Sequence, residues 1–277
     1  MLFRSTTGER WAAISISAEL DPTGEVGQGG YWLHVSHDRG ATWDRPLYLG
    51  LQQFQPYVVP ATSRLPMLKG SLLQLEVQVR ELDPESISFP PVALSSKREA
   101  DDLYIERSLD DLARDSDRDG LTDLLEDKLR TDPHSADTDG DGLDDASDSL
   151  PGISLQGPPP ADADVIARVF EHILGYEAGA IQLGVAAGRH TEDLFANMLG
   201  SPAKSARGVT FLLADKDMLT GLLLPSPIIV LDAADLAYLN ARFGIHYPVQ
   251  FPSPWFNRAR TKAVVQWSAG WTGGTLR

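Results

Sequence analysis

The chain has 277 residues, 42% of them hydrophobic, and a formal net charge of −15. It contains no cysteine, which excludes disulfides, thiolate metal sites and cysteine nucleophiles. No run of about 18 apolar residues occurs, so we expect no transmembrane helix. Residues 1–8 lack the apolar stretch of a signal peptide, so either the chain begins within a longer gene product or the protein stays in the cytoplasm.

The negative charge is concentrated in one block. Residues 101–150 hold 18 acidic and 5 basic residues, a net charge of −13, whereas the rest of the chain holds 21 acidic and 19 basic residues. Such a block repels nucleic-acid backbones and attracts cations, so we expect no nucleic-acid partner. A solvated, disordered acidic segment has the same composition, but the spacing of its residues favours metal binding.

Residues 1–108 are predicted to form an antiparallel β module. Candidate strands cover residues 11–18, 31–37, 46–51 and 71–82, and clusters of glycine, proline and aspartate separate them. In the last of these, Leu73, Leu75, Val77 and Val79 alternate with polar residues, the period of a half-buried strand. A small antiparallel sandwich is the expected result.

Within this module, residues 36–43 match the pattern S-x-D-x-G-x-T-W at all five specified positions. This octapeptide, Ser36–Trp43, resembles the Asp-box of the bacterial neuraminidase repeat. The resemblance implies a β-hairpin turn in which Asp38 accepts hydrogen bonds from loop amides, Gly40 supplies the backbone freedom and Trp43 packs beneath the turn. One copy in about 100 residues cannot build a sialidase propeller, so the resemblance indicates a β-rich, secreted-type module and no catalytic role.

Residues 109–150 contain two consecutive twelve-residue loops with oxygen-bearing groups at positions 1, 3, 5, 7, 9 and 12 and glycine at position 6. The expected ligands are Asp115, Asp117, Asp119, the Leu121 carbonyl, Asp123 and Glu126 in the first loop, and Asp137, Asp139, Asp141, the Leu143 carbonyl, Asp145 and Asp148 in the second. Calcium takes six to eight hard oxygen ligands at about 2.3–2.6 Å, and alternate aspartates on a curled backbone can supply them.

The glycines at position 6, Gly120 and Gly142, allow the sharp turn that this geometry needs. Asp148 is one methylene shorter than Glu126, so the second site is expected to bind more weakly or through one oxygen. Magnesium is the rival ion, but it prefers fewer protein ligands and keeps its waters. Because the crowded carboxylates repel one another without metal, folding of this block should depend on calcium, with two ions bound.

The two loops contain the segments DSDRDGLTDLLE and DTDGDGLDD, and the connector between them includes Thr131-Asp132-Pro133. Over residues ~110–151 they resemble thrombospondin type 3 repeats and related bacterial calcium-binding repeats. The resemblance implies an extracellular or cell-envelope setting and a structural role for the ions. A paired EF-hand is disfavoured because no full helix precedes Asp115, and a dockerin because Pro151 stops a second helix. We therefore expect little regular structure in this central segment.

The remaining chain is predicted to be a Pro/Gly linker at residues 151–161 and an α+β domain at residues 162–277, whose final strand is expected to be truncated at the C-terminus. Helices are expected at residues 162–174 and 233–243, the second capped by Asp232. Strands are expected at residues 209–213, 227–231, 247–251 and 262–271, with Gly273 and Gly274 in a hairpin turn.

Our main hypothesis is a non-enzymatic, secreted or cell-envelope protein in which calcium rigidifies the junction between two modules. One alternative is an enzyme whose active site lies in the C-terminal domain. Its acid–base candidates are Arg189, His190, Glu192, Asp193, His246 and Tyr247, but no established catalytic motif surrounds them. Ser201 and Lys204 match the spacing S-x-x-K, which is common by chance. The other alternative is a glycan- or protein-binding module, which needs an exposed aromatic patch around Trp32 or Tyr57.

Overall fold

The computed structural model describes residues 3–7, 10–17, 19–20, 29–52, 57–60, 63, 66–83, 95–174, 177–183, 194, 198–199, 209–224, 227–243, 249–251, 255–259, 262–269 and 272–276. The chain is mixed α/β and forms two compact units. The first comprises Met1–Ser17, Gln28–Ser116 and Thr122–Leu125, and the second comprises Ala18–Gly27, Asp117–Leu121 and Glu126–Arg277. Within the described ranges, no helix is long and apolar enough to cross a membrane.

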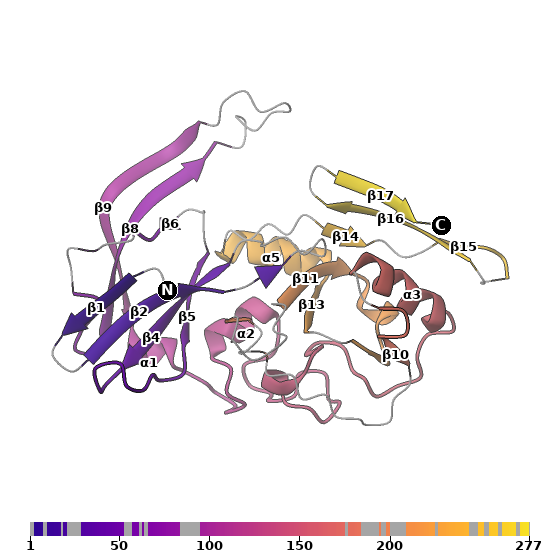
Figure 1. The fold of residues 1–277 in the computed structure, drawn as a ribbon, viewed down its shortest axis with the longest axis horizontal. Helices are drawn as coiled ribbons and strands as arrows, with labels where there is room; N and C mark the ends of the chain where they lie inside the picture. Colours follow the sequence, from indigo (N-terminus) through magenta and orange to yellow (C-terminus); the bar gives the residue numbers. More distant parts are fainter. Residues whose placement is uncertain are drawn as a thin grey trace. The chain divides into compact units, whose positions relative to one another are not determined.

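One sheet of the first unit contains four antiparallel strands in the order β1-β2-β4-β5 (Figure 1). They are β1 (Phe3–Thr7), β2 (Arg10–Ile16), β4 (Gly30–Ser36) and β5 (Leu47–Gln52). The sequence predicted the last three of these strands to within a few residues. It did not predict β1, whose residues lack a clear alternation of apolar and polar side chains.

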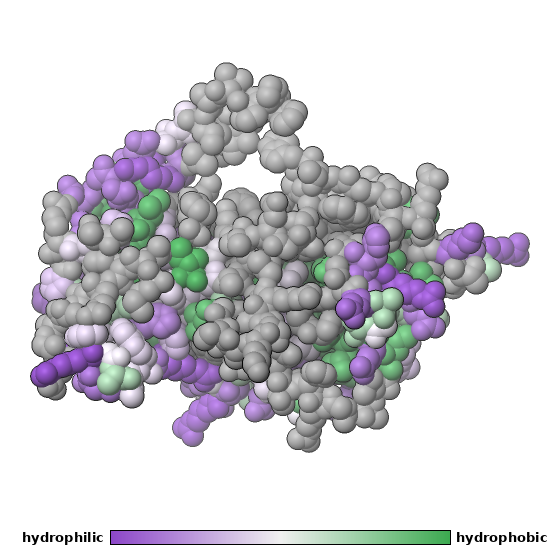
Figure 2. All heavy atoms as spheres, viewed as in Figure 1, coloured by the Kyte–Doolittle hydropathy of each residue, from purple (hydrophilic) through white to green (hydrophobic). Residues whose placement is uncertain are grey.

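The second sheet of this unit is dominated by a long ribbon of β8 (Leu72–Leu82) and β9 (Ser96–Ser108), with the short strands β6 (Tyr57–Val58) and β7 (Leu68–Lys69) also on β8. The predicted alternation in β8 is confirmed, because Leu73, Leu75, Val77 and Val79 are buried. β9 is mostly exposed and its ribbon presents largely hydrophilic residues in Figure 2. The short helix α1 (Leu109–Leu112) follows it.

The two sheets of the first unit share one hydrophobic core. Ile14, Leu33 and Leu49 from the first sheet cluster with Leu73 and Leu75 from β8. Full burial of one such side chain contributes roughly 1.5–3 kcal/mol. This is the sandwich that the alternating strands predicted.

The turn between β4 and β5 has the hydrogen bonds that its sequence motif predicts. The Ser36 hydroxyl and the Thr42 amide each donate to Asp38 Oδ1 at 2.8 Å, and the Thr42 hydroxyl donates to Asp38 Oδ2 at 2.6 Å. Bonding to Thr42, followed by that to Ser36, lowers the pKa of Asp38 to about 2. Trp11 lies closest to Gly40, where an added Cβ would meet its ring at 2.6 Å, whereas Trp43 remains 37% exposed.

The main sheet of the second unit mixes parallel and antiparallel pairs in the order β13-β11-β14-β16-β15, with β3 beside β11 and β17 beside β16. The strands are β3 (Glu19–Leu20), β11 (Val209–Ala214), β13 (Ile228–Leu231), β14 (Val249–Phe251), β15 (Trp255–Phe256), β16 (Ala263–Ala269) and β17 (Thr272–Leu276). A smaller sheet pairs β10 (Gln182–Leu183) with β12 (Leu222–Leu223). The strands β13 and β14 both lie parallel to β11.

The helices of this unit agree with their predictions. They are α3 (Ala163–Ile173) and α5 (Ala233–Phe243), and a 3-10 turn, η3 (Lys216–Met218), follows β11. Asp232 caps α5, since its Oδ1 accepts from the amides of Ala234 and Asp235 at 2.7 and 2.8 Å. The N-cap signal read from the sequence therefore corresponds to a real pair of hydrogen bonds.

Two predictions for this region differ from the structure. Gly273 and Gly274 pair with Ser268 and Trp267 inside the β16–β17 ladder, so the prediction of a glycine turn was wrong. The reason is that β16 ends at Ala269, earlier than predicted, so the strands reverse before the glycines. In the segment expected to be a linker, Ile153 is 5% exposed and belongs to the core of the second unit.

Candidate metal-binding loops

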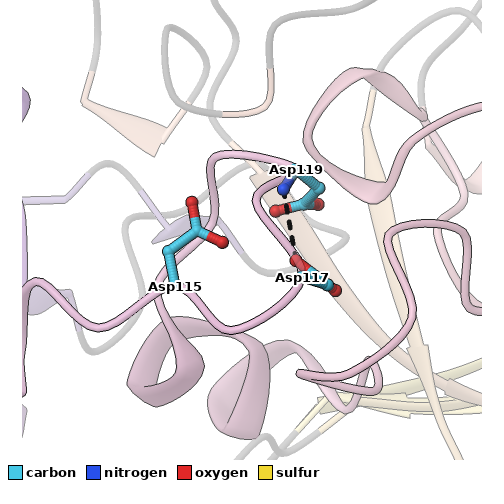
Figure 3. Close-up of side chains that lie close together, drawn as sticks. All are labelled: Asp115, Asp117 and Asp119. Atoms are coloured by element: carbon cyan, nitrogen blue, oxygen red, sulfur yellow. Dashed lines mark hydrogen bonds between the residues drawn. The ribbon is translucent and has the colours of Figure 1, made fainter.

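The structure draws together the aspartates at positions 1, 3 and 5 of each loop. In each triad, Asp115–Asp117–Asp119 and Asp137–Asp139–Asp141, one ligand oxygen per residue lies within 4.8 Å of the other two. Figure 3 shows the first triad, in which the Asp119 amide donates to Asp117 Oδ1 at 3.2 Å. Three carboxylates at this spacing can hold one cation.

The two loops have the same backbone course. Position 4 has positive φ in both, 68° at Arg118 and 75° at Gly140, and so has position 6, at 102° for Gly120 and 91° for Gly142. These left-handed turns curl the chain so that alternate side chains face one point. The φ angle is larger at position 6 than at position 4, and only glycine adopts so large a positive φ without strain.

Side chains brace this backbone in the same way in both loops. Position 3 accepts the amide of position 5, from Asp119 to Asp117 at 3.2 Å and from Asp141 to Asp139 at 3.1 Å. Position 5 accepts the amide of position 7, from Leu121 to Asp119 at 2.6 Å and from Leu143 to Asp141 at 3.0 Å. Two sequences that agree at only some positions thus fold into one architecture.

Position 9 bonds back to position 2. Asp123 accepts from the amide and hydroxyl of Ser116 at 2.8 and 2.9 Å, and Asp145 accepts from those of Thr138 at 2.9 and 2.7 Å. The structure therefore does not bring Asp123 or Asp145 into the triads. The sequence did not lead us to predict a role for the hydroxyl at position 2. The signal for it is that both loops carry a hydroxyl residue there, Ser116 and Thr138.

Positions 7 and 12 carry the loops into the protein interior. Leu121 and Glu126 are fully buried, Leu143 is half-buried, and Asp148 is 1% exposed. Glu126 lies in the middle of the helix α2 (Asp123–Leu129), and Asp148 follows the 3-10 turn η2 (Asp145–Ser147). Neither carboxylate belongs to a triad, but the charges of Asp141 and Asp139 act on Asp148.

One carboxylate oxygen at position 3 of each loop is left without a donor. Asp117 Oδ2 and Asp139 Oδ2 are both buried, and neither has a hydrogen-bond partner among the described residues. A buried, charged acceptor without a donor is costly. A cation at the centre of each triad would satisfy both oxygens, and a set of carboxylates and carbonyls matches calcium or magnesium rather than a softer metal.

Burial and mutual repulsion raise the pKa values of three aspartate side chains in the second loop. Burial, followed by the charge of Asp141, raises the pKa of Asp139 to about 7. Burial also raises the pKa of Asp148 to about 7 and that of Asp145 to about 6, against the hydrogen bonds that each accepts. Such shifts are expected where several partly buried carboxylates lie close together.

The two loops also touch each other. Asp119 Oδ2 accepts from the amide of Ala146 at 3.2 Å, which joins position 5 of the first loop to position 10 of the second. Both residues belong to the second unit. A cation held by Asp119 would therefore act on a group that is bonded to the other loop.

The residues behind the alternative functions are in part outside the described structure. All the acid–base candidates, Arg189, His190, Glu192, Asp193, His246 and Tyr247, and also Ser201 and Lys204, lie outside the described residues. In the first unit Trp32 is fully buried, with its ring 5.5 Å from that of Tyr48, and Tyr57 is half-buried. Trp32 therefore cannot form the surface patch that glycan binding requires.

Comparison of the chain with protein-family models, with curated proteins and with solved structures found no match.

Proposed function

We propose that this protein binds two calcium ions, one at each aspartate triad. The observation that carries the proposal is the buried oxygen without a donor at position 3 of both loops, Asp117 Oδ2 and Asp139 Oδ2. The shared backbone turns and the shared hydrogen bonds support it, because they aim the carboxylates of each triad at one point.

Calcium is favoured over magnesium by the number of oxygen groups that each loop gathers. Each loop offers three clustered carboxylates together with the carbonyl at position 7 and the buried carboxylate at position 12, Glu126 or Asp148. Magnesium prefers one or two carboxylates and retains its waters. Extracellular modules with loops of this kind bind calcium at about 10⁻⁴–10⁻³ M.

The role that we propose is structural and non-enzymatic. The resemblance of residues ~110–151 to thrombospondin type 3 repeats supports a secreted or cell-envelope setting, where calcium is plentiful. In this proposal the ions stiffen the acidic segment that separates the N-terminal β module from the C-terminal region along the sequence.

Calorimetric titration of two matched variants tests the proposal. Asp139→Asn removes one ligand charge but keeps the Oδ1 atom that accepts the Asp141 amide. Asp144→Asn removes the same charge from an exposed residue of the same loop whose side chain makes no capping bond. We expect two sites in the wild type and in Asp144→Asn, and an affinity about tenfold or more weaker at one site in Asp139→Asn.

The proposal fails if the wild type takes up no calcium at millimolar concentration, or if both variants lose the same affinity. The second result would mean that the segment attracts calcium only through its overall charge. Titration with magnesium under the same conditions should give weaker binding.

A further inference from the structure

The end of the second loop is built into the core of the second unit. Asp148 Oδ1, at position 12, accepts the amide of Leu150 at 2.8 Å. Leu150 and Ile153 are 1% and 5% exposed and cluster with Ile166 and Phe170 of α3. The last expected ligand thus lies two residues from a core side chain.

The same segment is also paired with the main sheet. The amide of Ile228, the first residue of β13, donates to the carbonyl of Ser149 at 2.9 Å. Ser149 itself is 1% exposed and directly follows Asp148. Any movement of position 12 therefore acts on the backbone that meets β13.

A second attachment begins at position 5. Asp141 Oδ2 accepts the amide of Leu155 at 3.1 Å, and the side-chain amide of Gln156 donates to the Asp141 carbonyl. The neighbouring Ser154 carbonyl accepts from the amide of Gly221, next to β12, at 3.3 Å. Two expected ligands of the second loop, Asp141 and Asp148, therefore accept hydrogen bonds from residues 150–156, the segment that contributes Leu150 and Ile153 to the core of the second unit.

We propose that the ion in the second loop is a folding ligand of the second unit, so that calcium controls whether this unit is stably folded. This inference rests on the calcium binding proposed above. Without the ion, the repulsion among Asp139, Asp141 and Asp148 acts on the residues that hold Leu150 and β13 in place. With the ion, this repulsion becomes attraction to a common centre.

The β sandwich of the first unit serves as an internal reference. Among the described residues, its core contains residues of β2, β4, β5 and β8, such as Ile14 and Leu75, and none of the second loop, whereas Leu124 of the first loop packs against it. Calcium bound at the second loop should therefore protect the second unit while leaving the sandwich unchanged.

The size of the effect follows from mass action. A ligand present at 100 times its Kd, and bound only by the folded form, lowers the unfolded population about 100-fold. Hydrogen exchange of the most protected amides in the second unit should slow by about the same factor.

The experiment is hydrogen–deuterium exchange of the full chain, without calcium and with calcium at 100 times the Kd measured by calorimetry, read at the peptides covering β13, α3, β2 and β4. The Ile228 amide is the most direct reporter because it bonds to the Ser149 carbonyl. In the wild type we expect calcium to slow exchange in β13 and α3 about 100-fold. Asp139→Asn should lose this calcium-dependent slowing in β13 and α3 but respond to calcium as the wild type does in β2 and β4, and Asp144→Asn should behave as the wild type throughout.

Calorimetry on the same samples separates the two ways of failing. If calcium binds but exchange in β13 and α3 is unchanged, the loop takes up its ion without holding the unit together, and this inference is wrong. If no calcium binds, the proposed function itself is wrong. Equal loss of calcium protection from β2 and from β13 in Asp139→Asn would also overturn the inference, since the ion in the second loop would then act on the whole chain and not on the second unit.

Discussion

At the scale of single residues, the aspartates of the second loop sit in an environment that opposes their charge. Asp139 has one oxygen bonded to the Asp141 amide and the other buried without a donor among the described residues. Asp148 is almost fully buried and faces the charges of Asp141 and Asp139. Both groups therefore favour a proton or a metal ion over the bare carboxylate.

The stability of the calcium-free protein should consequently fall as pH rises. The pKa values of Asp139 and Asp148 are raised to about 7 in the folded state and that of Asp145 to about 6, whereas an unfolded aspartate has a pKa of about 3.9. Between about pH 4 and pH 7 the folded state thus binds more protons than the unfolded state, and stability decreases through this window. Melting temperatures measured from pH 4.5 to 7.5 in metal-free buffer check this.

Calcium should reverse the slope. A bound ion keeps the carboxylates deprotonated, so their pKa values drop below those of the unfolded chain and stability rises with pH in the same window. Asp139→Asn should show a shallower slope than Asp144→Asn in metal-free buffer. A metal-free melting temperature that climbs steadily from pH 4.5 to 7.5 would contradict the account of this loop.

At the scale of elements, α2 is fixed at its C-terminal end by α5. The helix ends at Leu129, and Arg130 follows with a φ of 65°, while the Thr131 amide donates to the Glu126 carbonyl at 3.2 Å. This closing bond usually accompanies glycine. Arg130 tolerates the conformation because its side chain is held by α5.

The contacts between these helices are ionic and aromatic. The Arg130 guanidinium lies 4.2 Å from the centre of the Tyr238 ring, and its Nε donates to Asp235 at 3.0 Å. The Tyr238 hydroxyl donates to Asp127 at 2.7 Å, which raises the pKa of Tyr238. Asp127 follows Glu126 directly, so position 12 of the first loop and the α5 contact share one helical turn.

A double-mutant cycle measures this contact. We expect Asp127→Asn and Tyr238→Phe each to lower stability, with a coupling of roughly 0.5–1 kcal/mol, because the bond is charge-assisted but partly exposed. Chemical denaturation of the two single variants and the double variant gives the coupling. Tyr104→Phe, at an exposed position of β9, is the control and should leave stability unchanged. Additive effects of the two substitutions would show that the contact contributes nothing.

The elements that the sequence predicted are those with a local signal. The period of two in β8, the N-cap at Asp232 and the spacing of the aspartates each depend on residues within one turn or one strand. β9 was missed because its exposed, charged residues carry no apolar alternation. The bonds from Ser116 to Asp123 and from Thr138 to Asp145 were not predicted because a carboxylate at position 9 is equally suited to an ion and to a neighbouring hydroxyl.

At the scale of the whole molecule, the sequence predicted the mixture of a β-rich N-terminal region with helices and strands further on, but not the pairing of distant strands. The parallel neighbours of β11, which are β3, β13 and β14, follow from contacts that no local pattern records. For the same reason no local pattern predicted that residues 149–155 pack with β13 and α3, since the proline and glycine there are equally typical of a linker.

The most direct test of the central claim, that each aspartate triad holds a calcium ion, is an anomalous difference map from crystals of the full chain grown in millimolar calcium. The account predicts two peaks, one among Asp115, Asp117 and Asp119 and the other among Asp137, Asp139 and Asp141. A map with no peak at either triad would contradict it, and the paired loops would then be acidic turns that bind no ion.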